Sequence, residues 1–271
     1  MITVVMIVAP AAASPKRSSE SRRISVIFAL ALVIVACTST LAATESTEQR
    51  PAFAVLLFSK TGGFRHDSIS AGIAAVKDLG DHHGFRVDAT EDATMFTDGG
   101  LEKYHVVIFL NTTGDILDSS EEAAFERFLR RGRGFVGIHS ATDTEYGWPW
   151  YGGLVGAYFR KHPAIQPATL KVADKTHPST KHLPAEWTRT DEWYDFRDDP
   201  SPRVNVLIRI DETTYAGGTM GASHPIAWYH EYEGGRAWYT ALGHTTESYK
   251  EPAFLGHLLG GILWAAGLTL E

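Results

Sequence analysis

The chain has 271 residues, a net charge of −7 with histidine uncharged, 12 histidines and one cysteine. Because an acidic chain without a basic block binds a phosphate backbone poorly, we expect no nucleic-acid partner. Its single cysteine, Cys37, lies in the N-terminal leader described next. We therefore expect no thiol nucleophile, disulfide or thiolate metal site in the mature protein.

Residues 1–43 have the pattern of an export signal. Arg22 and Arg23 precede an apolar run over 24–36, and small residues follow as far as Ala43. This run is shorter than the roughly 20 residues that span a bilayer as a helix, so we expect no membrane span. The pattern predicts a signal peptide over 1–43, cleaved near Ala43, and a periplasmic or secreted protein.

Two further interpretations of the leader stay open. Residues 34–37 resemble a lipoprotein box, in which Cys37 would carry a lipid anchor, and residues 21–25 loosely resemble a twin-arginine signal. After a linker over 44–51, we expect one domain over 52–271, a length that suits a single large core. The sequence does not indicate an oligomeric state.

The first half of this domain alternates strands with helices. Continuous apolar runs predict buried strands at 53–58, 85–89, 105–110 and 134–138. One helix is expected over 69–82, with Ile73, Val76, Lys77 and Leu79 patterning it. Another is expected after a Ser119 or Ser120 cap, with Ala123, Phe125, Phe128 and Leu129 facing inward. This alternation predicts a parallel, doubly wound α/β sheet.

The second half is less regular. Strands are expected at 168–172, 204–210, 226–229 and 236–242, followed by a helix over 252–266 with proline in its first turn. An aromatic-rich insert between about 145 and 235 is expected to cover one end of the sheet.

Polar residues follow several of the predicted strands. Ligands of open α/β sheets bind beyond the carboxyl ends of the strands. The residues found there are Arg65, His66 and Asp67, then Asn111, then His139, Ser140 and Asp143, and finally His244. Histidine can act as an acid, a base or a metal ligand. We therefore expect His66, His139 and His244 to converge in one site, where a divalent metal is an open alternative.

The insert adds residues that suit a sugar. Aromatic faces stack on the C–H faces of a sugar, and carboxylates accept its hydroxyl groups. The candidates are Trp150, Tyr151, the run Asp191, Glu192, Trp193 and Tyr194, and the histidines of the His-Pro pairs, of which His177 and His224 are predicted to bind substrate. A partly buried aromatic strand and ordinary turns are the structural alternatives.

Other site types fit less well. The glycines at 134 and 137 lack the third glycine and the ribose-binding acid of a dinucleotide fingerprint, so no nucleotide cofactor is expected. The turn after 134–138 has the shape of a nucleophile elbow, but His139 occupies the elbow and Ser140 comes one residue late. A two-carboxylate glycosidase is disfavoured because Asp191 and Glu192 are neighbours, and neighbours in a strand point to opposite faces.

Taken together, the motifs resemble the trehalose-utilisation (ThuA-like) family over residues 52–267. The segments that carry the resemblance are 64–68, 137–143, 150–153, 177–178, 191–194, 224–226 and 241–245. The resemblance implies a flavodoxin-like fold similar to class I glutamine amidotransferases, with helices on both faces of a layered sheet. It also implies that His139 stands where the amidotransferase cysteine would be. The family is associated with disaccharide catabolism, alongside oxidoreductases that make 3-keto-glycosides.

The leading hypothesis is an enzyme (an isomerase, lyase or hydrolase) that acts on a disaccharide or a 3-keto-glycoside. His139 or His244 would be the base, and Glu192 or Asp191 the leaving-group acid or hydroxyl anchor. His66 and Arg65 would stabilise the enolate oxygen. The alternative is a non-catalytic sugar-binding module, which explains the aromatic residues but leaves the histidines without a purpose.

Overall fold

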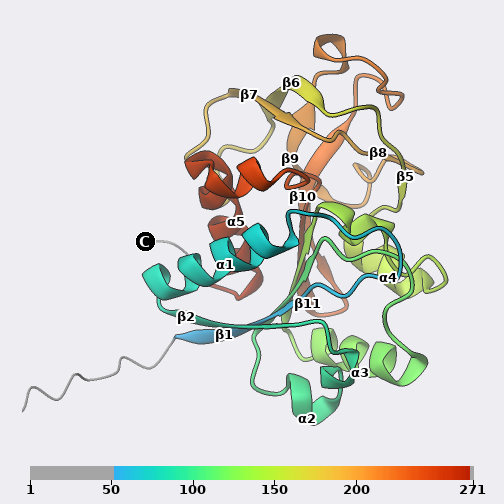
Figure 1. Cartoon of the computed structure of the whole chain (residues 1–271), viewed down its shortest axis with the longest axis vertical. Coiled ribbons are helices and arrows are strands. Elements are labelled where there is room, and N and C mark those ends of the chain that lie inside the picture. The colour runs from blue at the N-terminus through green and yellow to red at the C-terminus, as the bar shows by residue number, and fades with distance from the viewer. Residues whose placement is uncertain (1–51, 269–271) are drawn as a thin grey trace, which may run out of the picture. The chain divides into compact units, whose positions relative to one another are not determined.

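A computed structural model describes residues 52–268, which are built around one nine-stranded sheet (Figure 1). The order of its strands is β2-β1-β3-β4-β11-β10-β9-β6-β7. Their bounds are β1 Phe53–Phe58, β2 Phe85–Thr90, β3 Val106–Leu110, β4 Gly134–Ile138, β6 Gln166–Val172, β7 Glu186–Asp191, β9 Asn205–Ile210, β10 Pro225–Tyr232 and β11 Gly235–Thr240. The short strands β5 (Phe159–Lys161) and β8 (Asp195–Phe196) form a separate pair.

The sheet is parallel in one half and antiparallel in the other. Strands β2, β1, β3 and β4 pair with one another in parallel, as the sequence pattern predicts, and β11 pairs in parallel with β4. From β11 onward, β10, β9, β6 and β7 pair in antiparallel fashion. Much of the insert therefore extends the sheet, whereas we expected it to cover one end. An open edge at β11 would leave backbone groups unpaired, and the hairpin partner β10 satisfies them.

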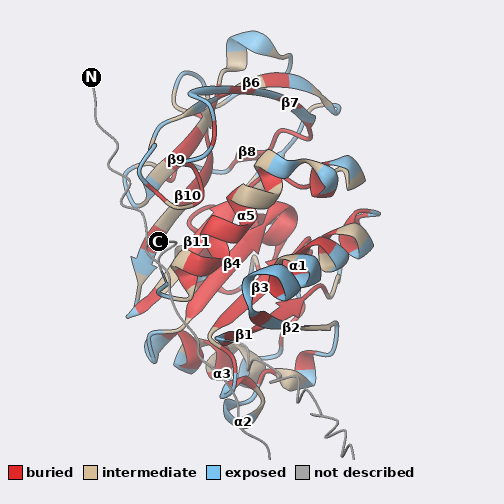
Figure 2. Cartoon of the chain, turned by 90° about the vertical axis from the view of Figure 1, so that its left-hand side faces the viewer, coloured by how far each residue is buried: buried red, intermediate tan, exposed pale blue. Residues whose placement is uncertain are grey.

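Helices lie on both faces of the sheet. Helices α1 (Ile69–His83) and α5 (Pro252–Ala265) cover one face, while α3 (Ser119–Arg130) and α4 (Pro149–Val155) lie on the other (Figures 1 and 2). The short helix α2 (Asp98–Leu101) packs against α3. Every residue of β1, β3 and β4 is buried between these layers, which explains their continuous apolar runs.

Two helices differ in detail from the sequence expectations. Helix α3 is capped by Asp118, which forms a capping box with Glu121, and not by Ser119 or Ser120. The buried face of α3 includes Ala124 in place of Ala123. On α1, Lys77 is exposed, although it was expected to be part of the helix pattern. Phe125, Phe128 and Leu129 of α3 are buried as expected, whereas the buried stripe of α1 runs through Gly72, Ala75 and Val76 and is displaced by about one residue.

The expected signal peptide, its cleavage near Ala43 and the lipid anchor on Cys37 lie outside the described residues. Within residues 52–268, no helix is both long enough and apolar enough to cross a membrane.

Two histidines of the core make the fold sensitive to acid. Burial lowers the pKa of His257 to about 3 and that of His177 to about 4. Below about pH 6.5 these two histidines bind protons in the unfolded chain but remain unprotonated in the folded chain. The free energy of unfolding therefore falls as the pH falls. We expect each residue to contribute roughly 2 kcal/mol of this loss between pH 8 and pH 5.

Urea unfolding at both pH values checks this expectation, with His257→Gln as the comparison. Glutamine can still donate to the carbonyl oxygen of Ser179, which accepts from His257 Nδ1 at 2.9 Å, but it does not titrate. The variant should lose less stability on acidification than the parent chain. Equal losses in the two proteins would contradict the role of His257.

Candidate functional site

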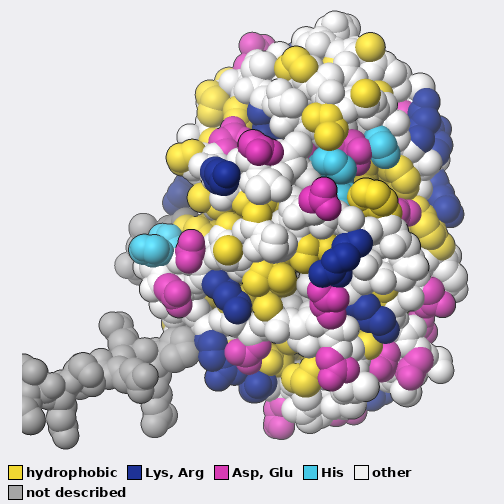
Figure 3. All heavy atoms as spheres, viewed as in Figure 1, with side chains coloured by type: hydrophobic (Ala, Val, Ile, Leu, Met, Phe, Trp, Pro, Cys, Tyr) yellow, Lys and Arg dark blue, Asp and Glu magenta, His cyan; other side chains and the backbone are white. Residues whose placement is uncertain are grey.

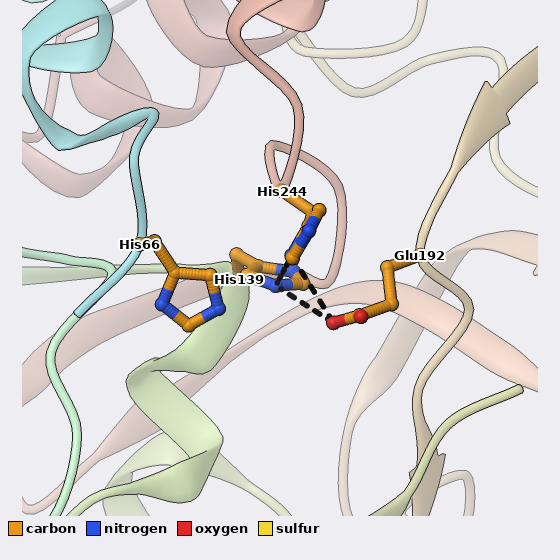
Figure 4. A group of neighbouring side chains, drawn as sticks. All are labelled: His66, His139, Glu192 and His244. Carbon is orange, nitrogen blue, oxygen red and sulfur yellow. Dashed lines mark hydrogen bonds and ion pairs between the residues drawn. The ribbon is translucent and has the colours of Figure 1, made fainter. Parts of the chain in front are cut away.

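Four side chains from segments far apart in the sequence converge beyond the carboxyl ends of the parallel strands. His66 precedes α1, His139 follows β4, Glu192 follows β7 and His244 follows β11 (Figure 4). Each offers one ligand-type nitrogen or oxygen, and these atoms lie within 4.8 Å of one another. The structure thus brings together the three histidines that the strand-end pattern predicted.

His139 occupies a strained turn at the end of β4. Its φ of +51° lies in the left-handed region, which is uncommon for residues other than glycine and is typical of functional turns. Its side chain is fully buried, and its Nδ1–H donates to the carbonyl oxygen of Ala241 at 2.8 Å. Since a carbonyl oxygen only accepts, Nδ1 carries a proton here, and Nε2 is directed at the cluster.

His244 is positioned by the loop that follows β11. Gly243 has a φ of +108°, and a Cβ there would lie 2.8 Å from the hydroxyl oxygen of Tyr249. The carboxylate of Asp191 accepts the backbone N–H groups of Gly243 and His244, at 2.9 and 3.1 Å. Asp191 therefore shapes this loop from behind the site.

Glu192 links two histidines of the cluster to a third outside it. Its Oε2 lies 3.5 Å from His139 Nε2 and 3.1 Å from His244 Nδ1, and its Oε1 lies 3.0 Å from His162 Nδ1. Burial by itself raises the pKa of Glu192, but the hydrogen bonds and charges of His139 and His244 outweigh burial and hold it far below its usual value. An ionised Glu192 suits an ion partner or ligand better than a leaving-group acid.

The two cavity-facing histidines of the cluster have opposite pKa shifts. Burial, together with the charges of His139 and His244, lowers the pKa of His66 to about 3. Burial also lowers the pKa of His244, but the hydrogen bond and charge of Glu192 outweigh it, so the net shift is upward. His66 Nδ1 lies 3.4 Å from Ser140 Oγ, which places Ser140 behind His66.

A cavity of about 210 Å³ opens above the cluster. Its walls combine aromatic, acidic and imidazole side chains, contributed by Phe64, His66, Asp143, Phe159, His162, Glu192, Tyr194 and His244. Histidine side chains reach the surface beside acidic and apolar ones at the upper right of Figure 3. Burial raises the pKa of Asp143, although a hydrogen bond from Tyr146 at 2.6 Å opposes this. Such a lining suits a small polyhydroxylated ligand.

Several predicted binding residues lie behind or beside the cavity. Arg65 is exposed and pairs with Glu91, at 2.6 Å, instead of facing the cluster. Asp67 is exposed at the entrance to α1, outside the cavity lining. The buried amide of Asn111 donates to Ser68 Oγ at 2.9 Å and joins two strand-end loops. Like Asp191 and Ser140, Asn111 supports the site and does not line it.

Five further predicted residues are used in packing and in hydrogen bonds within the protein. On α4, Trp150 donates to Glu233 and the buried Tyr151 donates to the carbonyl oxygen of Ala141. Trp193 is buried with its indole N–H on the carbonyl oxygen of Gln166. His177 lies against Tyr229 and Trp264, and His224 is buried beneath Tyr194, whose carbonyl oxygen it contacts at 2.8 Å. These side chains make contacts within the protein and do not line the cavity.

Three residues of the cavity were not among the predicted site residues. Phe159 is a single aromatic residue without a motif, and nothing in the sequence marks it. Phe64 begins the segment 64–68 that carries the resemblance, and that segment is the signal by which it could have been found. His162 belongs to a His-Pro pair, and that pair is the signal by which it could have been found. Phe64 is 67% exposed, unusual for a phenylalanine, and lies edge-on to His66 with their ring centroids 4.9 Å apart. It is therefore available to stack on a ligand.

Comparisons with known proteins agree with the fold and identify the family. The model of the family described as trehalose utilisation, ThuA, matches residues 54–265. A ThuA-like protein from Bacteroides uniformis superimposes with a TM-score of 0.69 at 25% identity, covering 80% of this chain and 92% of that one. A ThuA-like protein from Parabacteroides merdae has a TM-score of 0.69 at 22% identity, covering 82% and 92%. No curated protein sequence matches the chain.

A β-galactosidase from Bacillus circulans shares the fold at a TM-score of 0.54 and 14% identity; the match covers 82% of this chain but 32% of the galactosidase.

Proposed function

Because the chain belongs to the trehalose-utilisation (ThuA) family, whose model spans most of its length, its function is related to carbohydrate use, and we propose that it is an enzyme that processes a disaccharide or a 3-keto-glycoside. The observation that carries this proposal is the convergence of His66, His139, His244 and Glu192 at the floor of a cavity with aromatic walls. Sugar binding alone would not require buried imidazoles facing a carboxylate.

The proposed chemistry is proton abstraction next to a ketone. A keto group at C3 acidifies the proton on C2, so a base can remove it and leave an enediolate. Return of the proton to C3 gives the 2-keto isomer. Alternatively, the electron pair forms the C1–C2 double bond and expels the glycosidic oxygen, which takes a proton from an acid.

The cavity offers imidazoles for these transfers. His139 is fully buried below the lining, so direct contact with the sugar falls to His66, His162 and His244. The Nδ1 of His162 lies 3.0 Å from Glu192 Oε1, an arrangement in which a carboxylate orients a general base. The aromatic rings of Phe64, Phe159 and Tyr194 would hold the apolar face of the sugar.

We further propose that the protein is exported, on the basis of the leader pattern over residues 1–43. The mass of the mature protein from its native host tests this: cleavage near Ala43 supports periplasmic or secreted location, and a lipid on Cys37 supports a lipoprotein. A full-length protein that keeps residues 1–43 would contradict export by this signal.

The proposed activity is tested with the purified protein and trehalose, sucrose and their 3-keto forms, followed by mass spectrometry of the products. Turnover of the keto-sugars alone would support enolisation, and turnover of the unoxidised sugars would support hydrolysis. Measurable binding with no product from any of them would contradict the enzyme and support the sugar-binding module, which the aromatic walls of the cavity favour.

A further inference from the structure

We propose that His139, His244 and Glu192 bind one divalent transition-metal cation, such as Zn²⁺, at the floor of the cavity, with His66 as the fourth protein ligand. This inference rests on the proposed function and deepens it, because the cation would lie where the oxygens of a bound keto-sugar are expected.

The spacing of the ligand atoms fits a cation. His139 Nε2, His244 Nδ1 and Glu192 Oε2 form a triangle with edges of 3.2, 3.1 and 3.5 Å. Ligands about 2.0–2.1 Å from a tetrahedral cation lie about 3.4 Å apart, and octahedral neighbours lie about 3.0 Å apart. The ligand atom of His66 lies within 4.8 Å of the others, so a small side-chain movement would bring it into coordination.

The backbone hydrogen bond of His139 leaves its second ring nitrogen, Nε2, directed at the other ligand atoms. Its Nδ1–H donates to the carbonyl oxygen of Ala241 at 2.8 Å, and this bond orients the ring so that Nε2 points at Glu192 Oε2, 3.5 Å away. His244 Nδ1 lies near both atoms, 3.2 Å from His139 Nε2 and 3.1 Å from Glu192 Oε2. One cation would satisfy all three atoms at once.

Neighbouring residues already hold the proposed metal ligands in position. A metal-bound histidine commonly donates its other ring N–H to a backbone carbonyl, as His139 does to Ala241. Asp191 fixes the backbone of His244, and His162 contacts the remaining oxygen of Glu192. The ligands come from rigid strand ends and are mostly shielded from water, with side-chain exposures of 0% for His139, 8% for Glu192 and 19% for His244.

A second cluster with similar residue types provides a contrast. Asp195, Glu212 and His224 also offer atoms within 4.8 Å of one another. However, both ring nitrogens of His224 are already used, Nδ1 by Glu212 at 2.8 Å and Nε2 by the carbonyl oxygen of Tyr194 at 2.8 Å. His224 thus has no lone pair free, and this cluster is a hydrogen-bonded support for Tyr194.

The test uses the full chain after removal of metals with a chelator. Calorimetric titration with Zn²⁺ should show one site, and Co²⁺ should give visible absorption bands typical of nitrogen and oxygen coordination. Glu192→Gln and His139→Asn should each weaken Zn²⁺ binding by at least about 100-fold. The control Glu212→Gln, in the second cluster, should leave the affinity unchanged.

The outcomes separate this inference from the proposed activity. Absence of Zn²⁺ and Co²⁺ binding, or binding that Glu192→Gln leaves intact, would overturn the metal site whatever the activity. Weakening by Glu212→Gln alone would place the cation in the second cluster and overturn it as well. One-site binding lost in Glu192→Gln would support it even if no sugar is turned over, a result that would contradict only the proposed function.

Discussion

Replacing His139 by alanine is expected to lower the turnover of the keto-sugar substrate by at least about 100-fold, the usual contribution of an acid–base group. His139 is fully buried, and its Nε2 faces both His244 and Glu192. Its loss removes the imidazole that orders these two groups, whether His139 transfers a proton through them or holds a cation. The initial rates of variant and parent chain at saturating substrate measure the effect.

The controls address folding. Alanine is strained at a φ of +51°, so His139→Asn is the companion variant, because asparagine tolerates the left-handed region. His82→Ala, on the exposed surface of α1, should keep full activity. If a folded His139→Asn protein, verified by circular dichroism, turns over at the parental rate, the assignment of His139 to the site is refuted.

Replacing Asp191 by alanine is expected to lower the free energy of unfolding by about 3–5 kcal/mol, the usual cost of breaking a buried ion pair. Asp191 is fully buried and lies 3.0 Å from Arg189 Nη1. It also accepts the N–H groups of Gly243 and His244, so its loss leaves buried donors unpaired. This is a large share of the 5–15 kcal/mol that stabilises an ordinary domain.

Urea denaturation measures this effect, and a matched surface aspartate serves as its control. Asp98 also pairs with two arginines, Arg127 and Arg131, but is exposed, so Asp98→Ala should change stability little. Asp191→Asn should be intermediate, since it keeps one acceptor oxygen but removes the charge. A loss in Asp191→Ala no greater than in Asp98→Ala would show that the β11 loop does not depend on this carboxylate.

The parallel half of the sheet could be predicted from the sequence because its strands are covered on both faces. Such strands are uniformly apolar, and the runs at 53–58 and 134–138 match β1 and β4 residue for residue. The antiparallel half was predicted only in part. Strand β7 buries Trp187, Arg189 and Asp191 on one face, so it lacks the alternation of apolar and polar residues that predicts a strand. The strands of the separate pair, β5 and β8, have three and two residues, which is too short for a periodic signal.

The histidine cluster could be predicted because parallel strands end at a common edge. Residues that directly follow β4 and β11 must lie near each other once these strands are neighbours. The same reasoning cannot predict the position of Glu192, because Glu192 follows β7 in the antiparallel half of the sheet. Its neighbours Asp191 and Trp193 carry equally suitable chemistry but point elsewhere, into the support of the β11 loop and into the core.

The sequence by itself determined the family, the layered α/β fold and the three strand-end histidines, since each depends on local patterns and on the common direction of parallel strands. Only the tertiary structure decided which residues meet the cavity. Trp150 and Trp193 satisfy their indole N–H groups within the protein, while Phe64, Phe159 and His162 line the cavity. The physical reason is that aromatic and acidic side chains suit both packing and ligand binding. Which role a residue has depends on whether its side chain points into the core or into the cavity, and this is decided by the tertiary structure.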